Sequence, residues 1–250
     1  MQTSFKRISI LGVPIDDILL DEAVERIERF FRDGGCHHIV TVNPEFVMEA
    51  QHNQRFREVL QSADLATPDG TGLVLASRWL KTPLRGRVTG VELSERLAQL
   101  CATQGRSIFL LGAAEGVAEQ TAAIWQKRYP GLTIAGCFAG SPKPEHAPAI
   151  CQLIAASKPD LLLVAYGHPK QDLWIAQYQA ELGVPVAMGV GGVFDYVSGR
   201  VPRAPAWMRR LGLEWLYRLI RQPQRWKRIW VAFPLFSWTV LRHGRRFMLP

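Results

Sequence analysis

Polar residues that can bind or activate a substrate follow five apolar runs of the sequence. Ligands of open α/β sheets bind beyond the carboxyl ends of the strands, so residues that follow a strand are the first candidates for a site. One of them, Asp69, is a carboxylate that can take a proton from a substrate hydroxyl. The five candidate places are Thr41-Val42-Asn43, Pro68-Asp69-Gly70, residues 111–116, residues 166–171, and Gly189-Val190-Gly191-Gly192.

Asp69 and Arg87 are the pair best suited to a group transfer. Asp69 can act as a base, although an Asp before Gly bonds equally well to the backbone of its own turn. Arg87 has a planar fork of donors that suits a diphosphate, whereas a lone arginine is more often a surface charge. Thr41 and Asn43 are also typical of ordinary strand ends. Taken singly, none of these residues identifies a reaction.

Glycine-bearing turns after residues 111 and 188 offer backbone N–H groups to a phosphate, which makes Gly112, Gly191 and Gly192 candidates for substrate binding. One such turn taken alone is more often a tight strand-to-helix connection. The sequence has neither G-x-G-x-x-G nor G-x-x-x-x-G-K-[ST]. A dinucleotide dehydrogenase and a P-loop enzyme are therefore disfavoured.

The spacing of His, Cys, Asp and Glu predicts no metal site. There is no D-x-D motif, and His37, His38 and His168 have no partner at metal-ligand spacing. The four cysteines form no C-x-x-C pair, which argues against a disulfide framework and favours a reducing cytoplasm. We expect neither a metal nor a cofactor.

The elements that must position these residues alternate regularly along the chain. Strands are expected at residues 8–15, 38–42, 64–70, 107–111, 132–137, 160–165 and 184–188, and helices at 20–32, 45–61, 115–129, 145–157 and 169–182. Continuous apolar strands that alternate with helices indicate a mainly parallel sheet covered on both faces. The expected fold is a Rossmann-like α/β body. The apolar run at 8–15 is broken by Gly12 and Pro14, so we interpret it as a first strand, not a signal peptide.

The last 51 residues are charged very differently from the rest. Residues 200–250 hold twelve Lys and Arg against the single acid Glu214, a net charge of +11, whereas residues 1–199 are at −3. Five of the eight Trp also lie there. Basic residues interleaved with Trp suit either an anionic lipid surface or a nucleic acid. We therefore predict an α/β domain at 1–199 and a basic helical appendage at 200–250, with two helices broken at Pro223.

Several motifs taken together resemble the WecG/TagA/CpsF glycosyltransferase family over nearly the whole chain. The joint pattern is far more specific than any one of its parts. The motifs are Gly12-Val13-Pro14-Ile15-Asp16, Thr41-x-Asn43-Pro44-Glu45, Pro68-Asp69-Gly70, Arg87-Val88-Thr89-Gly90, Gly167-His168-Pro169-Lys170-Gln171, Gly189 to Asp195, Gly199-x-x-x-Arg203-Ala204-Pro205 and Gly212-Leu213-Glu214-Trp215-x-x-Arg218-Leu219.

The resemblance implies an inverting, metal-independent transfer of a sugar from a UDP-sugar to a polyprenyl-diphosphate-linked acceptor. The sugar would be N-acetylmannosamine, its uronic acid or glucose, and the product a bacterial surface polysaccharide or teichoic acid. The resemblance makes Asp69 the general base, with Thr41 as a second catalytic residue; Thr41 and Asn43 would line the same pocket and hold the acceptor or donor sugar. Arg87 would stabilise the leaving UDP, and Gln171 would contact substrate. Asp172 stands where many relatives have Glu, which leaves its role open.

For the C-terminal appendage, the resemblance implies docking on the inner face of the cytoplasmic membrane and completion of the site over the acceptor's diphosphate. Arg218, Arg221 and Arg225, followed by Arg228, would share one helix face if Pro223 bends the helix without ending it. The rival hypothesis is a nucleic-acid-binding protein that uses its basic, Trp-rich tail. The oligomeric state stays open, because an apolar face can pack on a second subunit as well as on lipid.

Overall fold

The computed structural model describes residues 5–244, apart from the side chains of Arg210 and Arg225. Its centre is a six-stranded sheet in the order β4-β3-β8-β7-β5-β6, and every neighbouring pair is parallel. The α/β fold predicted from the sequence is therefore confirmed. The strands are β3 (His37–Val42), β4 (Leu65–Pro68), β5 (Ser107–Gly112), β6 (Thr133–Phe138), β7 (Leu161–Ala165) and β8 (Val186–Gly189).

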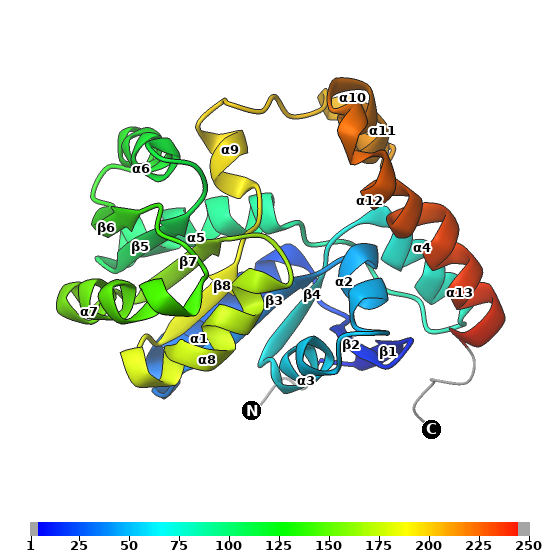
Figure 1. Ribbon diagram of the computed structural model, residues 1–250, viewed down its shortest axis with the longest axis horizontal. Helices are drawn as coiled ribbons and strands as arrows, with labels where there is room; N and C mark the ends of the chain where they lie inside the picture. The colour runs from blue at the N-terminus through cyan, green and yellow to red at the C-terminus, as the bar shows by residue number, and fades with distance from the viewer. Residues whose placement is uncertain (1–4, 245–250) are drawn as a thin grey trace.

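Helices cover both faces of the sheet (Figure 1). Alternate strand residues face opposite sides: Leu161 and Leu163 join one core cluster, whereas Leu162 and Val164 join another. The first cluster packs under α1 (Leu20–Asp33), α5 (Gly90–Gln104), α6 (Val117–Arg128) and α9 (Val193–Val197). The second packs under α7 (Ala147–Ser157), which follows a 3₁₀ turn, and α8 (Lys170–Leu182).

The region expected as one helix at 45–61 contains two. Helix α2 (Pro44–Glu49) starts at the cap residue Asn43, and α3 (Gln54–Ser62) starts at Asn53, whose side-chain oxygen accepts a hydrogen bond from the backbone N–H of Phe56. An asparagine that caps a new helix interrupts the preceding one. Both helices and α4 (Thr71–Trp79) pack in a third core cluster beside β3 and β4.

The first strand expected at 8–15 is a hairpin. Strands β1 (Arg7–Ile10) and β2 (Val13–Asp16) pair antiparallel in a separate two-stranded sheet. Leu11 and Gly12 both have positive φ, +52° and +82°, as a two-residue hairpin turn requires. Asp16 is buried; it pairs with Arg7 at 2.7 Å and accepts a hydrogen bond from the Ala66 N–H, which attaches the hairpin to β4.

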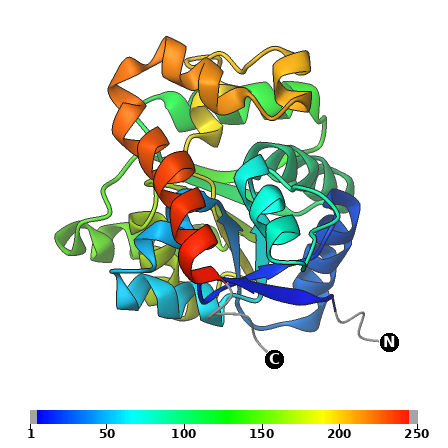
Figure 2. The ribbon, with the colours of Figure 1, turned by 90° about the vertical axis from the view of Figure 1, so that its right-hand side faces the viewer.

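The C-terminal segment is helical and lies along the body (Figures 1 and 2). It contains α10 (Ala206–Arg210), α11 (Glu214–Arg221), the 3₁₀ turn η2 (Pro223–Arg225), α12 (Trp226–Trp230), the π-helical η3 (Val231–Leu235) and α13 (Phe236–His243). The backbone of Gln222 is not helical, with φ −136° and ψ 72°, so the helix is interrupted just before Pro223. Phe236 and Val240 pack in the third core cluster. The division at residue 199 stays a prediction.

None of the helices described between residues 5 and 244 combines the length and the apolar character needed to cross a membrane.

Candidate active site

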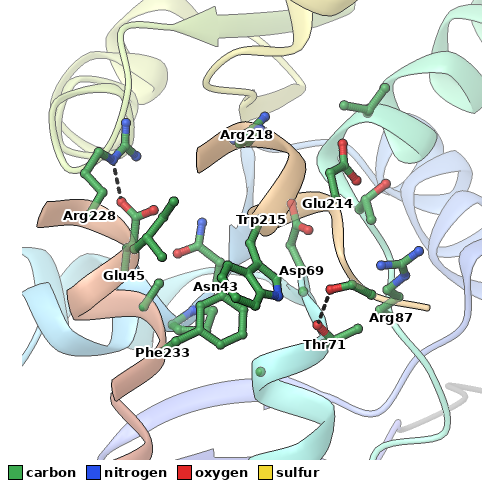
Figure 3. A pocket seen from close by; sticks show the side chains of 18 of the residues that line it. Asn43, Glu45, Asp69, Thr71, Arg87, Glu214, Trp215, Arg218, Arg228 and Phe233 are labelled. Carbon is green, nitrogen blue, oxygen red and sulfur yellow. Dashed lines mark hydrogen bonds and ion pairs between the residues drawn. The ribbon is translucent and has the colours of Figure 1, made fainter. Parts of the chain in front are cut away.

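A pocket lies at the carboxyl ends of β3 and β4, between the α/β body and the C-terminal helices (Figure 3). Asn43 follows β3 and Asp69 follows β4, and both line the pocket. Arg87 and Arg218 line it as well. The structure thus brings together four residues that are up to 175 positions apart in the sequence, as expected for residues at one edge of a parallel sheet.

The side chain of Asn43 is fixed in place because it caps helix α2. Its side-chain oxygen accepts a hydrogen bond from the Phe46 N–H at 3.1 Å, and Pro44 occupies the first position of α2. With its oxygen used in this way, the side-chain NH₂ group is the part of Asn43 that can donate to a ligand.

Asp69 is fixed by its backbone and by one side-chain hydrogen bond. Its N–H donates to the carbonyl of Val42 at 2.7 Å, and its Oδ2 accepts from the Gly90 N–H at 3.1 Å. Burial raises the pKa of Asp69 to about 6, against the opposing effects of the Gly90 hydrogen bond and the Arg218 charge. Glu214 and Glu92 raise this pKa further. A carboxylate with a pKa near the working pH is suited to general base catalysis.

Guanidinium groups give the pocket its positive charge. Arg87 donates to the carbonyl of Arg209 at 2.6 Å, which holds α10 against the body. The Arg218 guanidinium lies over the ring of Tyr196, 4.7 Å from its centroid. Arg228 and Arg203 complete the set of lining arginines, which face three lining acids, Glu45, Asp69 and Glu214. The excess of arginine suits an anionic ligand such as a diphosphate.

Two helix N-termini add partial positive charge to the pocket. Helix α4 starts directly after Asp69, with Gly70 at the cap position, and no side chain caps it. The first residues of α4, Thr71 and Gly72, line the pocket, and so does Thr89, the cap of α5. Backbone N–H groups in the first turn of a helix lack intrahelical partners and attract anions.

Other residues expected at the site lie outside the lining of this pocket. Thr41 is buried, and its Oγ1 lies 3.4 Å from the carbonyl of Gly189. Gln171 is also buried, and its Oε1 accepts from the Gly191 N–H at 2.9 Å. Gln171 therefore shapes the loop after β8, which also contains Gly192. Direct contact of Thr41, Gln171, Gly191 or Gly192 with substrate stays a prediction.

Gly112 has a structural reason to be glycine. Its φ is +102°, and a Cβ at this position would lie 2.8 Å from the backbone carbon of Ala165. The residue is thus needed for the close approach of β5 and β7. A contact between Gly112 and substrate stays a prediction.

The four C-terminal arginines do not form one continuous helix face, because α11 ends at Arg221. Arg218 and Arg228 line the pocket, whereas Arg221 is exposed and shares with Arg218 a second, separate pocket beside Arg200. The side chain of Arg225 lies outside the described residues. A role for Arg221 or Arg225 at the acceptor therefore stays a prediction.

Sequence reasoning did not assign Glu45, Glu214 and the aromatic residues of the pocket to the site. Trp215 and Phe233 lie with ring centroids 4.5 Å apart and form one wall. A signal was present for Glu214, the only acid between residues 200 and 250. In such a basic segment, a lone acid indicates a specific partner, here Arg203 at 3.9 Å.

Within residues 5–244, we find no group of three or more His, Cys, Asp or Glu side chains placed to hold a metal ion.

A parallel α/β sheet with a carboxylate beside several guanidinium groups at its carboxyl edge forms an enzyme-like site suited to an anionic substrate. The sequence model of one family, described as the glycosyl transferase WecG/TagA/CpsF family, matches residues 8–248. The chain belongs to this family, and the resemblance seen in its motifs is confirmed.

Curated relatives share most of their length with this chain. A Bacillus spizizenii protein is 39% identical over 212 residues, which cover 85% of this chain and 81% of the relative. A Bacillus subtilis protein is 34% identical over 238 residues, 95% and 92% of the two chains. A Staphylococcus aureus protein is 34% identical over 244 residues, 96% and 94%. All three are named N-acetylglucosaminyldiphosphoundecaprenol N-acetyl-beta-D-mannosaminyltransferase.

Proposed function

We propose that this glycosyltransferase moves N-acetylmannosamine from a UDP-sugar to N-acetylglucosamine carried on a polyprenyl diphosphate, with inversion and without a metal. The observation that carries the proposal is Asp69, a carboxylate with a pKa of about 6 in a pocket rich in arginine. The names of the relatives support the choice of sugar and acceptor.

Asp69 acts as the general base of a single displacement. It takes the proton of the acceptor hydroxyl while the hydroxyl oxygen bonds to the anomeric carbon and the bond from that carbon to UDP breaks. Attack from the side opposite the leaving group inverts the anomeric carbon. One base suffices for this route, which agrees with a pocket in which the other two lining acids are paired with Arg228 and Arg203.

Arginine takes the place of a metal ion at the leaving diphosphate. Arg87 and Arg218 are the two pocket arginines for which we propose this role, and the N-terminus of α4 adds partial positive charge. Their planar donors can form paired hydrogen bonds to phosphate oxygens.

The acceptor lipid requires the enzyme to work at a membrane surface. We propose that the protein binds as a peripheral protein to the inner face of the cytoplasmic membrane. The basic, Trp-rich residues 200–250 support this proposal.

A panel of UDP-sugars assayed with N-acetylglucosaminyl-diphosphate-lipid tests the proposal. UDP-N-acetylmannosamine is expected to give a β-linked product with undiminished turnover in excess EDTA, and NMR of the product reports the anomeric configuration. Turnover only with a different donor would refute the assigned sugar, and a retained configuration would refute the single displacement. Loss of turnover in EDTA, restored by a divalent ion, would refute the role of arginine in place of a metal.

A further inference from the structure

Helix α4 of the body and α13 of the C-terminal segment lie side by side on one face of the molecule. A Cβ on Gly72 would lie 4.0 Å from the Phe236 ring, and a Cβ on Gly244 would lie 2.7 Å from the Leu80 side chain. The two helices are thus in contact near both ends and run in the same direction. Figure 2 views this face, with α13 in red and α4 in cyan.

Large apolar side chains on this face are exposed to solvent. Leu75 and Trp79 lie one turn apart on α4, with exposed fractions of 61% and 52%. Trp238 and Leu241 on α13 are exposed to a similar degree, at 60% and 53%. Large exposed apolar residues on two adjacent helices favour an interaction surface. We call Leu75, Trp79, Trp238 and Leu241 the α4–α13 surface.

The charged residues on and next to α4 and α13 are basic. The exposed side chains of Arg78 and Lys81 flank Trp79, and the exposed Arg242 follows Leu241. The sequence contains no Asp or Glu between residues 70 and 91 or after Glu214. Trp and Leu with a basic rim match an anionic lipid surface, in which the apolar side chains enter the headgroup region and the basic ones bind headgroups.

Helix α4 also connects the surface to the pocket. Its first residues, Thr71 and Gly72, line the pocket next to Asp69, and Leu75 and Trp79 follow on the same helix. At a rise of about 1.5 Å per residue, Leu75 and Trp79 lie roughly 6 and 12 Å along the axis from Thr71. A bilayer bound at Leu75 and Trp79 would therefore have its headgroups close to the pocket.

We propose that the body helix α4 is itself a membrane-binding element, which acts together with α13 and sets the distance from Asp69 to the headgroups of an anionic bilayer. This inference rests on the proposed membrane-bound acceptor, but assigns to α4 a contact that the basic C-terminal charge alone does not imply. The C-terminal segment and the α/β body then bind the membrane as one surface.

Vesicle co-sedimentation of the full chain tests the role of α4. With vesicles of phosphatidylglycerol and phosphatidylethanolamine, the double variant Leu75→Ser, Trp79→Ser is expected to bind about ten-fold more weakly than the wild type. Leu153→Ser is the control, because Leu153 is also exposed, at 43%, and belongs to α7, which lies at the opposite end of the molecule from α4 and α13 (Figure 1). Thermal unfolding checks that each variant is folded.

Two outcomes of the binding experiments would overturn the proposal. One is unchanged vesicle binding by the folded double variant. The other is a change of oligomeric state, seen by light scattering, with vesicle binding intact; the α4–α13 surface would then be a contact between two copies of the chain.

A second assay separates this proposal from the proposed function. The double variant is expected to transfer sugar normally to a short-chain, water-soluble N-acetylglucosaminyl-diphosphate acceptor, and at least about five-fold more slowly to a long-chain acceptor in vesicles. Failure of the wild type with the water-soluble acceptor would refute the proposed function, whereas equal losses of the variant on both acceptors would refute the role of α4 in membrane binding.

Discussion

Arg228 of α12 pairs with Glu45 of α2 at one side of the pocket, with 2.7 Å between Nε and Oε2, although the two residues are 183 positions apart (Figure 3). Glu45 follows the cap residue Asn43 by two positions, so the ion pair connects the C-terminal segment to the same turn that ends β3. The ring of His168 lies 3.6 Å from the same carboxylate, and burial lowers the pKa of His168. The pair is one of the contacts that hold α12 over the site.

Loss of this ion pair is expected to loosen α12 locally without unfolding the protein. In Glu45→Gln, amide hydrogens of α12 should exchange faster, while the free energy of unfolding changes by less than about 1 kcal/mol, because the Arg228 side chain is half exposed. Hydrogen exchange measured by mass spectrometry checks this. Glu58→Gln on the exposed side of α3 is the control; equal exchange in both variants would show that the pair does not hold α12.

Replacement of Asp69 by Asn should remove the base. We expect kcat to fall by about 10²–10⁴-fold in Asp69→Asn, while circular dichroism stays unchanged. Initial rates with saturating donor and acceptor measure the effect, and the exposed Asp33→Asn serves as the control. Turnover of Asp69→Asn within a few-fold of the wild type would assign the base to another group.

The pH profile should report the same carboxyl. Because Asp69 must be ionised to accept a proton, kcat should rise ten-fold per pH unit below about 6 and level off above it. A profile that is flat from pH 5 to 8 would contradict this assignment.

Stability should show the opposite trend with pH. Burial raises the pKa of Asp69 in the folded state, so its contribution to stability is present below the unfolded value and is lost as the pH rises through about 6. At pH 8, Asp69→Asn should therefore unfold at a higher temperature than the wild type, with a free energy of unfolding that is larger by up to about 3 kcal/mol. At pH 4 the two proteins should differ little. Differential scanning calorimetry at the two pH values makes the comparison.

Arg218 should matter through both its charge and its planar shape. We expect Arg218→Ala to lower kcat/KM by about 10²–10³-fold, and Arg218→Lys to restore only part of it, because an ammonium group neither stacks on Tyr196 in the same way nor binds phosphate with paired donors. Arg55→Ala on the exposed side of α3 is the control. Full activity of Arg218→Lys would show that charge alone suffices.

Replacement of Gly112 should destabilise the folded protein. In Gly112→Ala the new Cβ meets the Ala165 backbone at a residue with φ of +102°, so the free energy of unfolding should fall by about 2–4 kcal/mol. Gly116→Ala is the matched control: φ is also positive there, at +77°, but no atom lies within 4 Å of the new Cβ. Its cost should be about 1 kcal/mol. Equal costs in urea unfolding would rule out the steric explanation.

Much of the fold follows from local patterns. Apolar runs such as 161–165 alternate with amphipathic helices, and this alternation is enough to predict a parallel sheet covered on both faces. The hairpin was missed because an interrupted apolar run is consistent with either one strand or two, and the positive φ of Leu11 was not visible in its type.

The site was predictable only in part. Strand ends identified Asn43 and Asp69, and the joint motif pattern added Arg87 and Arg218, all of which line the pocket. Thr41 and Gln171 stand at equally plausible positions but face the interior. The residues that line the pocket differ from Thr41 and Gln171 in the direction of their side chains, and sequence position does not reveal that direction.

The sequence by itself determined the sheet, the family and the identity of the candidate base, because periodicity, turn residues and motif order are properties of short segments. Only the tertiary structure decided which C-terminal arginines reach the pocket, that Glu45 pairs with Arg228, and that burial raises the pKa of Asp69. The physical reason is that charge pairing and desolvation depend on the distances between groups far apart in the chain, and folding alone brings those groups together.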